Sequence, residues 1–166
     1  EITLRTKPAL AAVERLAKVL SNVRIGVGTL LDPLDLKRAK NAGASFAVSP
    51  GLNMDIVKQA AFDDLAYLPG IQTSSEAMTG YRHGLRSLKF FPAKTAGGIY
   101  GLQQLAPLFP NLKFCPTGGI GFMEAPTYLA EKNVACVGGS FASPSSLIEE
   151  KNWKEITKLA QRAASL

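Results

Sequence analysis

The chain has 166 residues, of which 46% are apolar and 19% are charged, a composition typical of one folded globular domain rather than of a disordered segment. Its formal charge is +6, but the basic residues are scattered singly, which speaks against nucleic-acid binding and suits small anionic substrates such as phosphorylated acids. No apolar run approaches membrane-spanning length and no signal peptide opens the chain, so we expect no membrane association and a cytoplasmic location.

Short strand-like segments alternate with helical patterns along the whole chain. The predicted strands are Ile2–Arg5, Arg24–Val27, Ser45–Val48, Ala66–Leu68, Ser87–Phe91, Lys113–Cys115 and Ala135–Val137. The predicted helices lie near Pro8–Leu20, Pro33–Ala42, Met54–Phe62, Ser74–His83, Gly98–Leu108, Met123–Glu131 and Trp153–Ala164. Strict alternation of this kind predicts an α/β protein with a parallel sheet and right-handed crossovers.

Two architectures fit this alternation, an open doubly wound sheet and a (β/α)8 TIM-type barrel. No G-x-G-x-x-G motif follows a strand, and the glycines recur instead at strand ends, which favours the barrel. The predicted strands number seven rather than eight, and the chain opens directly on one of them. We therefore expect residues 1–166 to form a single barrel domain from which the first β–α unit is absent.

One lysine, Lys89, lies inside the apolar strand Ser87–Phe91. Because a strand alternates its side chains, Lys89 and Phe91 share one face, while Leu88 and Phe90 share the other. Lysine is seldom buried without a partner or a chemical purpose, and burial favours the neutral amine that attacks carbonyl groups. The alternative is a lysine whose stem lies along apolar surface while its ammonium reaches water.

The first predicted strand places Glu1, Thr3 and Arg5 on one face and Ile2 and Leu4 on the other. A carboxylate and a guanidinium that point into a barrel interior need partners or a substrate. One interpretation is an internal ion-pair network that stabilises the barrel, and the other is a binding or catalytic site.

Glycine pairs end the last two predicted strands, as Gly118-Gly119 after Thr117 and as Gly138-Gly139 before Ser140. In a complete barrel these would be strands seven and eight, whose loops form the usual phosphate site of this fold. Glycine lets backbone N–H groups approach phosphate oxygens, and the two hydroxyls can add donors.

Metal-ligating residues are scarce. His83 is the single histidine and has no carboxylate or second histidine at ligand spacing, so we expect no metal site. Cys115 and Cys136 each lie in a short apolar run and are expected to be reduced, structural residues.

Taken together, these segments resemble the family of 2-keto-3-deoxy-6-phosphogluconate (KDPG) and 4-hydroxy-2-oxoglutarate (KHG) aldolases. The matching segments follow one another in family order along the chain: Glu1–Thr6, Gly26–Thr29, Phe46–Gly51, Leu68–Gly70, Lys89–Ala93, Phe114–Gly119 and Val137–Ser140. The first strand and helix of the family, which precede the Glu1 segment, have no counterpart here.

The resemblance implies a class I aldolase with Lys89 as the Schiff-base lysine and Glu1 as the acid/base carboxylate. It implies that the carboxylate end of the substrate is held by Arg5, Thr29 and Thr117, and that the phosphate is held by Gly118, Gly119, Gly138, Gly139 and Ser140. Phe91 would pack beside the imine, and Pro50 would line the mouth of the site.

The implied reaction cleaves KDPG to pyruvate and glyceraldehyde 3-phosphate, with KHG as a second substrate, and it requires no cofactor. The resemblance also implies a homo-oligomer, commonly a trimer. Two alternatives stay open: an aldolase for a stereoisomeric or unphosphorylated 2-keto acid, and a catalytically inactive fragment that binds sugar phosphates.

Overall fold

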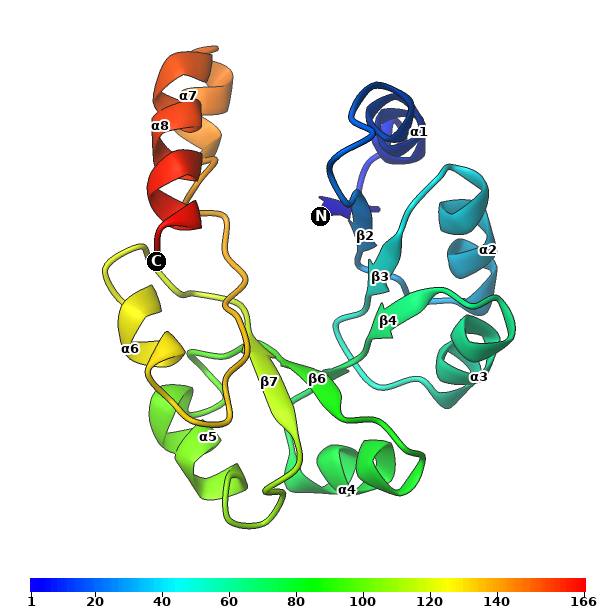
Figure 1. Cartoon of the computed structure of the whole chain (residues 1–166), viewed down its shortest axis with the longest axis vertical. Helices are drawn as coiled ribbons and strands as arrows, with labels where there is room; N and C mark the ends of the chain where they lie inside the picture. Colours follow the sequence, from blue (N-terminus) through cyan, green and yellow to red (C-terminus); the bar gives the residue numbers. More distant parts are fainter. The chain divides into compact units, whose positions relative to one another are not determined.

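Parallel strands alternate with helices along the chain, as the sequence predicts (Figure 1). The computed structural model describes all residues from Glu1 to Leu166. Backbone contacts divide the chain into two units, Glu1–Gly84 and Leu85–Leu166, and each is described here by itself.

The first unit contains a parallel sheet whose four strands follow chain order: β1 (Ile2–Thr3), β2 (Gly26–Gly28), β3 (Phe46–Val48) and β4 (Ala66–Leu68). The helices that connect them are α1 (Ala9–Val19), α2 (Pro33–Asn41) and α3 (Met54–Phe62), and the unit ends with β5 (Gly70–Ile71) and α4 (Ser74–Arg82). In register, Ile2 pairs with Val27, Val27 with Ala47, and Ala47 with Tyr67. Each crossover therefore returns the chain to the adjacent strand.

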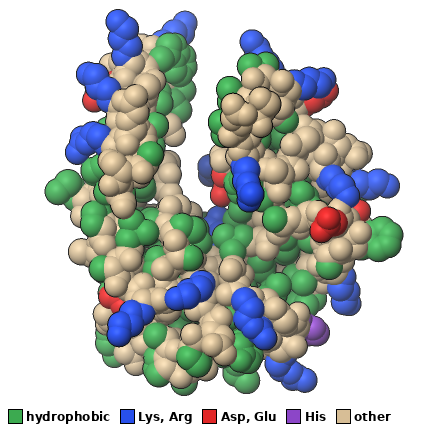
Figure 2. Space-filling model, in the orientation of Figure 1, with side chains coloured by type: hydrophobic (Ala, Val, Ile, Leu, Met, Phe, Trp, Pro, Cys, Tyr) green, Lys and Arg blue, Asp and Glu red, His purple; other side chains and the backbone are tan.

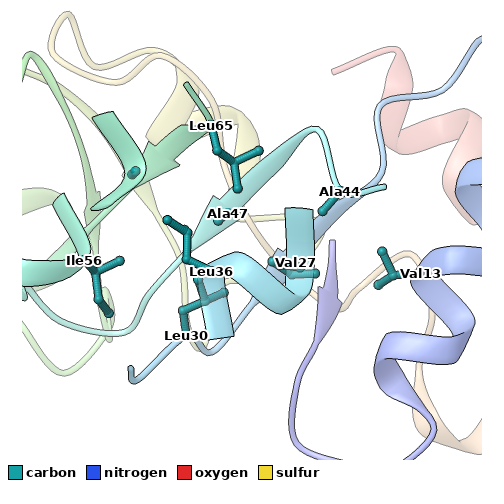
Figure 3. Close-up of a cluster of buried hydrophobic side chains, with 10 residues drawn as sticks. Val13, Val27, Leu30, Leu36, Ala44, Ala47, Ile56 and Leu65 are labelled. Carbon is teal, nitrogen blue, oxygen red and sulfur yellow. The ribbon is translucent and has the colours of Figure 1, made fainter. Parts of the chain in front are cut away.

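A buried apolar cluster joins these strands to the helices that cover them (Figure 3). Val27 and Ala47 from the sheet are fully buried and lie among Val13 of α1, Leu36 of α2 and Ile56 of α3. The strands bury apolar side chains because each helix covers them with its own apolar stripe.

Side-chain caps set where three of the helices begin. Asp32 accepts a hydrogen bond from the Leu34 N–H at the start of α2, and Asn53 accepts from the Asp55 N–H at the start of α3. Thr73 forms a reciprocal capping box at the start of α4. These caps satisfy N–H groups that have no partner inside the helix, so the predicted helix starts at residues 33, 54 and 74 are confirmed.

The second unit is built on β6 (Ser87–Phe90) and β7 (Lys113–Pro116), which pair in parallel with Leu88 opposite Phe114 and Lys89 opposite Cys115. Behind them the rings of Phe90 and Phe114 pack edge to face, with centroids 6.4 Å apart. The helices of this unit are α5 (Gly98–Leu105), α6 (Ala125–Leu129), α7 (Ser145–Glu149) and α8 (Trp153–Ala164).

The predicted strand Ala135–Val137 is wrong. The residues on either side of this segment instead make two isolated parallel bridges, Val134 to Phe114 of β7 and Gly138 to Thr117, which follows β7. Pro116 has no N–H group and cannot donate the ladder hydrogen bond between them, so regular pairing stops there. The Pro116 carbonyl still accepts the Gly138 N–H at 2.9 Å, and this bond keeps the segment beside β7.

Two short elements were not predicted, β5 and α7. β5 has two residues and directly follows Pro69, and α7 has five residues that follow Pro144. Neither is long enough to show the periodicity by which strands and helices are recognised in a sequence.

Candidate active site

Lys89 is buried in the middle of β6, with 6% of its surface exposed, between the fully buried Leu88 and Phe90. Its Nζ lies 4.8 Å from the centroid of the Phe91 ring, so the two side chains share a face, as the alternation predicts. The structure therefore does not support the alternative in which the Lys89 ammonium reaches water. A buried amine with an aromatic ring beside it is suited to covalent chemistry with a carbonyl group.

The neighbour of Lys89 across the sheet is Cys115, which is half-buried, and Cys136 lies on the adjoining segment and is exposed. The Cys115 thiol donates to the Cys136 sulfur, and this bond together with burial raises the pKa of Cys115 far above its ordinary value. The same hydrogen bond lowers the pKa of Cys136 to about 7. Both cysteines are free thiols, as expected, but Cys136 is exposed, which is unusual for a cysteine with a structural role.

A glycine loop follows β7. Gly118 and Gly119 have φ values of 101° and 77°, in the left-handed region that glycine adopts without strain. The Thr117 hydroxyl donates to the Cys115 carbonyl at 3.3 Å. The Phe91 ring lies against Gly118, where an added Cβ would come within 3.2 Å of the ring. This loop and the strand that carries Lys89 are thus in direct contact.

The Gly138–Ser140 segment lies next to this loop. Gly138 leaves room for the Thr117 hydroxyl, which an added Cβ would overlap, and Gly139 is covered by the Phe141 ring. The Ser140 carbonyl accepts the Ser143 N–H at 3.0 Å, so the serine begins a turn. Of the residues predicted to act together, the second unit therefore brings Thr117 against Gly138 and Phe91 against both Lys89 and Gly118.

Glu1 lies over the end of β2 in the first unit. Ile2 and Leu4 pack against the buried cluster, whereas Arg5 lies in the turn that follows β1. The Glu1 carboxylate occupies the space in which a side chain on Gly28 would lie. Arg5 Nε donates to Thr3 Oγ1 at 3.3 Å. A cavity of about 530 Å³ is lined by Glu1, Thr3 and Arg5 together with the start of α1. No ion pair joins Glu1 to Arg5, so the alternative interpretation of an ion-pair network does not apply to these two residues.

Thr29 directly follows Gly28 and has a φ of 63°, an uncommon conformation for a β-branched residue and one that occurs often at functional sites. The next residue, Leu30, is tied to β3 because its N–H donates to the Val48 carbonyl at 3.2 Å. Thr29 is therefore held between two neighbouring strand ends.

Pro50 lies in a loop that is fixed by hydrogen bonds that the sequence did not reveal. Buried Ser49 donates from Oγ to the Gly51 carbonyl at 2.6 Å and lies 2.6 Å from the Tyr67 hydroxyl. Burial raises the pKa of Tyr67, so its hydroxyl stays protonated at neutral pH. The Pro50 carbonyl lies against Gly70, which has no side chain to displace it.

On the face shown in Figure 2, the Lys and Arg side chains are distributed over several places and do not form a single patch. No group of three or more His, Cys, Asp or Glu side chains comes together in a way that could hold a metal ion. None of the helices is long and apolar enough to cross a membrane.

Parallel βα units with a buried lysine beside a glycine loop are the features of an α/β enzyme that forms a Schiff base. The chain matches the KDPG and KHG aldolase family over residues 1–159 and belongs to this family.

Individual relatives support the family assignment. The chain is 44% identical to the KHG/KDPG aldolase of Escherichia coli, over 98% of this chain and 76% of that protein. The KDPG aldolase of Legionella pneumophila, solved with pyruvate captured as a covalent carbinolamine, superposes with a TM-score of 0.94 at 40% identity, over 98% of this chain and 79% of the other. The KDPG aldolase of Zymomonas mobilis, solved with 3-phosphoglycerate, gives a TM-score of 0.89 at 39% identity, over 98% and 76%.

Proposed function

We propose that this chain is a class I aldolase, a carbon–carbon lyase that cleaves KDPG to pyruvate and glyceraldehyde 3-phosphate and also acts on KHG. The observation that carries the proposal is Lys89, a buried amine beside an aromatic ring. The chain is 40% identical to the Legionella pneumophila protein, whose structure holds pyruvate as a covalent carbinolamine.

The chemistry begins at the amine of Lys89. The Nζ lone pair attacks the C2 ketone of the substrate to give a carbinolamine, and loss of water leaves a protonated imine. When the C4 hydroxyl loses its proton, the C3–C4 bond breaks and its electrons move into the imine to give an enamine. Protonation of the enamine carbon and addition of water then release pyruvate and restore the amine.

Glu1 is the residue we assign to the proton transfers at the C4 hydroxyl and at the enamine carbon, directly or through a water. Its carboxylate is held over Gly28 and lines a cavity, which supports this role. Arg5, Thr29 and Thr117 are assigned to the substrate carboxylate, and Pro50 to the mouth of the site. A guanidinium binds a carboxylate well because it presents several donors in one plane.

The glycine segments 118–119 and 138–139, with Ser140, are assigned to the substrate phosphate. The left-handed backbone at Gly118 and Gly119 supports this assignment, because residues in this conformation occur in the backbone turns whose N–H groups bind anions. The Zymomonas mobilis relative was solved with a phosphorylated ligand, 3-phosphoglycerate.

The proposal extends to the architecture and assembly. The alternation of parallel strands and helices supports a single domain of the (β/α) barrel type over residues 1–166. The family resemblance further implies a cytoplasmic homo-oligomer, a trimer. Sedimentation velocity at several protein concentrations tests the trimer and would contradict it by returning the mass of a monomer or dimer.

Borohydride trapping tests the central claim. The protein is incubated with pyruvate and borohydride, and the reduced adduct is located by peptide mass spectrometry. We expect one adduct on Lys89 and none in Lys89→Met, while the control Lys113→Met keeps the adduct. Lys113 suits this control because it lies at the far end of β7, where its Nζ donates to the Lys132 carbonyl. Saturable sugar-phosphate binding without any adduct would instead favour the inactive binding protein.

A further inference from the structure

Lys94, which the sequence analysis did not single out, lies along the glycine loop that follows β7. Two backbone hydrogen bonds join the segments, from the Ala93 N–H to the Thr117 carbonyl at 2.8 Å and from the Lys94 N–H to the Gly118 carbonyl at 3.2 Å. The position of Lys94 relative to this loop is therefore set by the backbone and does not depend on a flexible side chain.

The Lys94 stem covers Gly119. An added Cβ on Gly119 would lie 3.0 Å from Lys94 Cβ and 3.2 Å from Lys94 Cδ, and all of its nearest neighbours belong to Lys94. The atoms nearest to an added Cβ on Gly118 come instead from Phe91 and Pro92. The loop assigned to the phosphate thus has one ammonium group attached to its edge.

The Lys94 ammonium pairs with the carboxylate of Glu124, and a substrate phosphate can replace this carboxylate as its partner. Lys94 Nζ lies 3.0 Å from Glu124 Oε1, and the other oxygen of Glu124 accepts the Gly121 N–H at 2.9 Å. The side chains are 61% and 46% exposed, so their attraction is weakened by water and contributes little to stability. A phosphate monoester carries more negative charge than a carboxylate and has three acceptor oxygens, so it competes well for the same ammonium.

We propose that Lys94 is a specificity-determining residue that contacts the substrate phosphate and favours phosphorylated over unphosphorylated 2-keto acids. This inference rests on the proposed function, because it requires the phosphate to bind at Gly118 and Gly119. In the free protein the ammonium pairs with Glu124, and with a phosphorylated substrate it turns toward the ester. A lysine can do this because its ammonium is a compact charge on a flexible stem.

The test compares kcat/KM for KDPG with kcat/KM for KHG, which has no phosphate. We expect Lys94→Met to lower kcat/KM for KDPG about fivefold, the upper range for an exposed charge pair, and to change that for KHG less than twofold. Glu124→Gln keeps an oxygen for the Gly121 N–H but releases Lys94, and should raise the KDPG-to-KHG ratio. The control Lys113→Met removes one positive charge from the same unit and should leave the ratio unchanged.

Ionic strength gives a second readout, which a purely structural role would not move. Salt screens an exposed ammonium–phosphate contact, so the KDPG-to-KHG ratio of the wild type should fall with added salt toward the ratio of Lys94→Met. The ratio of Lys94→Met itself should stay nearly constant. Equal losses of kcat/KM with both substrates in Lys94→Met and Glu124→Gln would mean that the ion pair only maintains the loop. No loss of kcat/KM with either substrate in Lys94→Met would mean that Lys94 does not contact the phosphate. Either result overturns the inference.

Failure of the proposed function would look different. A protein that forms no pyruvate adduct at Lys89 and cleaves neither substrate refutes the aldolase, and the role of Lys94 with it. A protein that forms the adduct and cleaves both substrates, but shows no effect at Lys94, refutes the role of Lys94 alone.

Discussion

The substitution Gly28→Ala tests whether the place of the Glu1 carboxylate matters for catalysis. A methyl group on Gly28 would overlap Glu1 Oε1 and lie 2.7 Å from the carboxylate carbon and 3.0 Å from Cγ. Non-bonded carbon atoms prefer a separation of about 3.5–4.0 Å, so the carboxylate has to move by about 1 Å. The backbone itself can accept alanine, because Gly28 is not among the residues with positive φ.

The expected effects on stability and on turnover therefore differ. The group that must move is the Glu1 carboxylate, at the end of a flexible side chain. A Gly→Ala change also lowers the entropy of the unfolded chain. We therefore expect the free energy of unfolding to change by less than about 1 kcal/mol. A misplacement of about 1 Å in a catalytic group can cost about 100-fold in rate. We expect kcat for KDPG cleavage to fall by about that factor.

The assay separates the step assigned to Glu1 from the step assigned to Lys89. Exchange of the pyruvate methyl protons with deuterated water should fall about 100-fold in Gly28→Ala, while borohydride still traps pyruvate on Lys89. Gly51→Ala is the matched control, because an added Cβ there has no atom within 4 Å. Proton exchange within threefold of wild type in a folded Gly28→Ala protein would refute the assignment of Glu1.

Three further predictions concern the second unit. Iodoacetamide should label exposed Cys136 at a rate that rises through pH 7, because its lowered pKa of about 7 makes it half thiolate at that pH. Cys115 should stay unlabelled because its pKa is raised. Equal labelling of the two cysteines in peptide mapping would contradict this prediction. Asn133→Ala removes the donor that bonds the Leu102 carbonyl at 2.8 Å, and urea denaturation should show a loss of about 1–3 kcal/mol, with no loss counting against the bond. Phe114→Ala empties a fully buried position and should cost about 3–5 kcal/mol in the same assay, and a loss below about 1 kcal/mol would show that the core does not depend on this ring.

The features that the sequence predicts well are those decided by neighbouring residues. The starts of α2 and α3 follow from Asp32 and Asn53, whose side chains accept hydrogen bonds from N–H groups two residues later. The burial of Lys89 follows in the same way from its place between apolar residues in β6. Such local patterns carry their structural meaning within a few residues of sequence.

The features that it misses depend on residues far apart in the chain. The predicted strand at residues 135–137 fails because Pro116, on the neighbouring strand, has no N–H group to offer. Ser49 meets Tyr67 18 residues away, and Lys94 meets Glu124 30 residues away. No sequence pattern connects the members of such pairs, so their contacts become known only from the folded structure.

The glycines at the strand ends have two different roles, although the sequence suggested one. Gly28 leaves space for the carboxylate of Glu1, and Gly138 leaves space for the hydroxyl of Thr117. Gly118 and Gly119 instead have positive φ values that alanine would strain. Alanine at position 28 or position 138 should therefore displace a side chain and reduce turnover in a stable protein. Alanine at position 118 or position 119 should instead distort the loop and reduce both stability and phosphate binding. The glycines at the strand ends thus also mark where side chains from neighbouring segments lie.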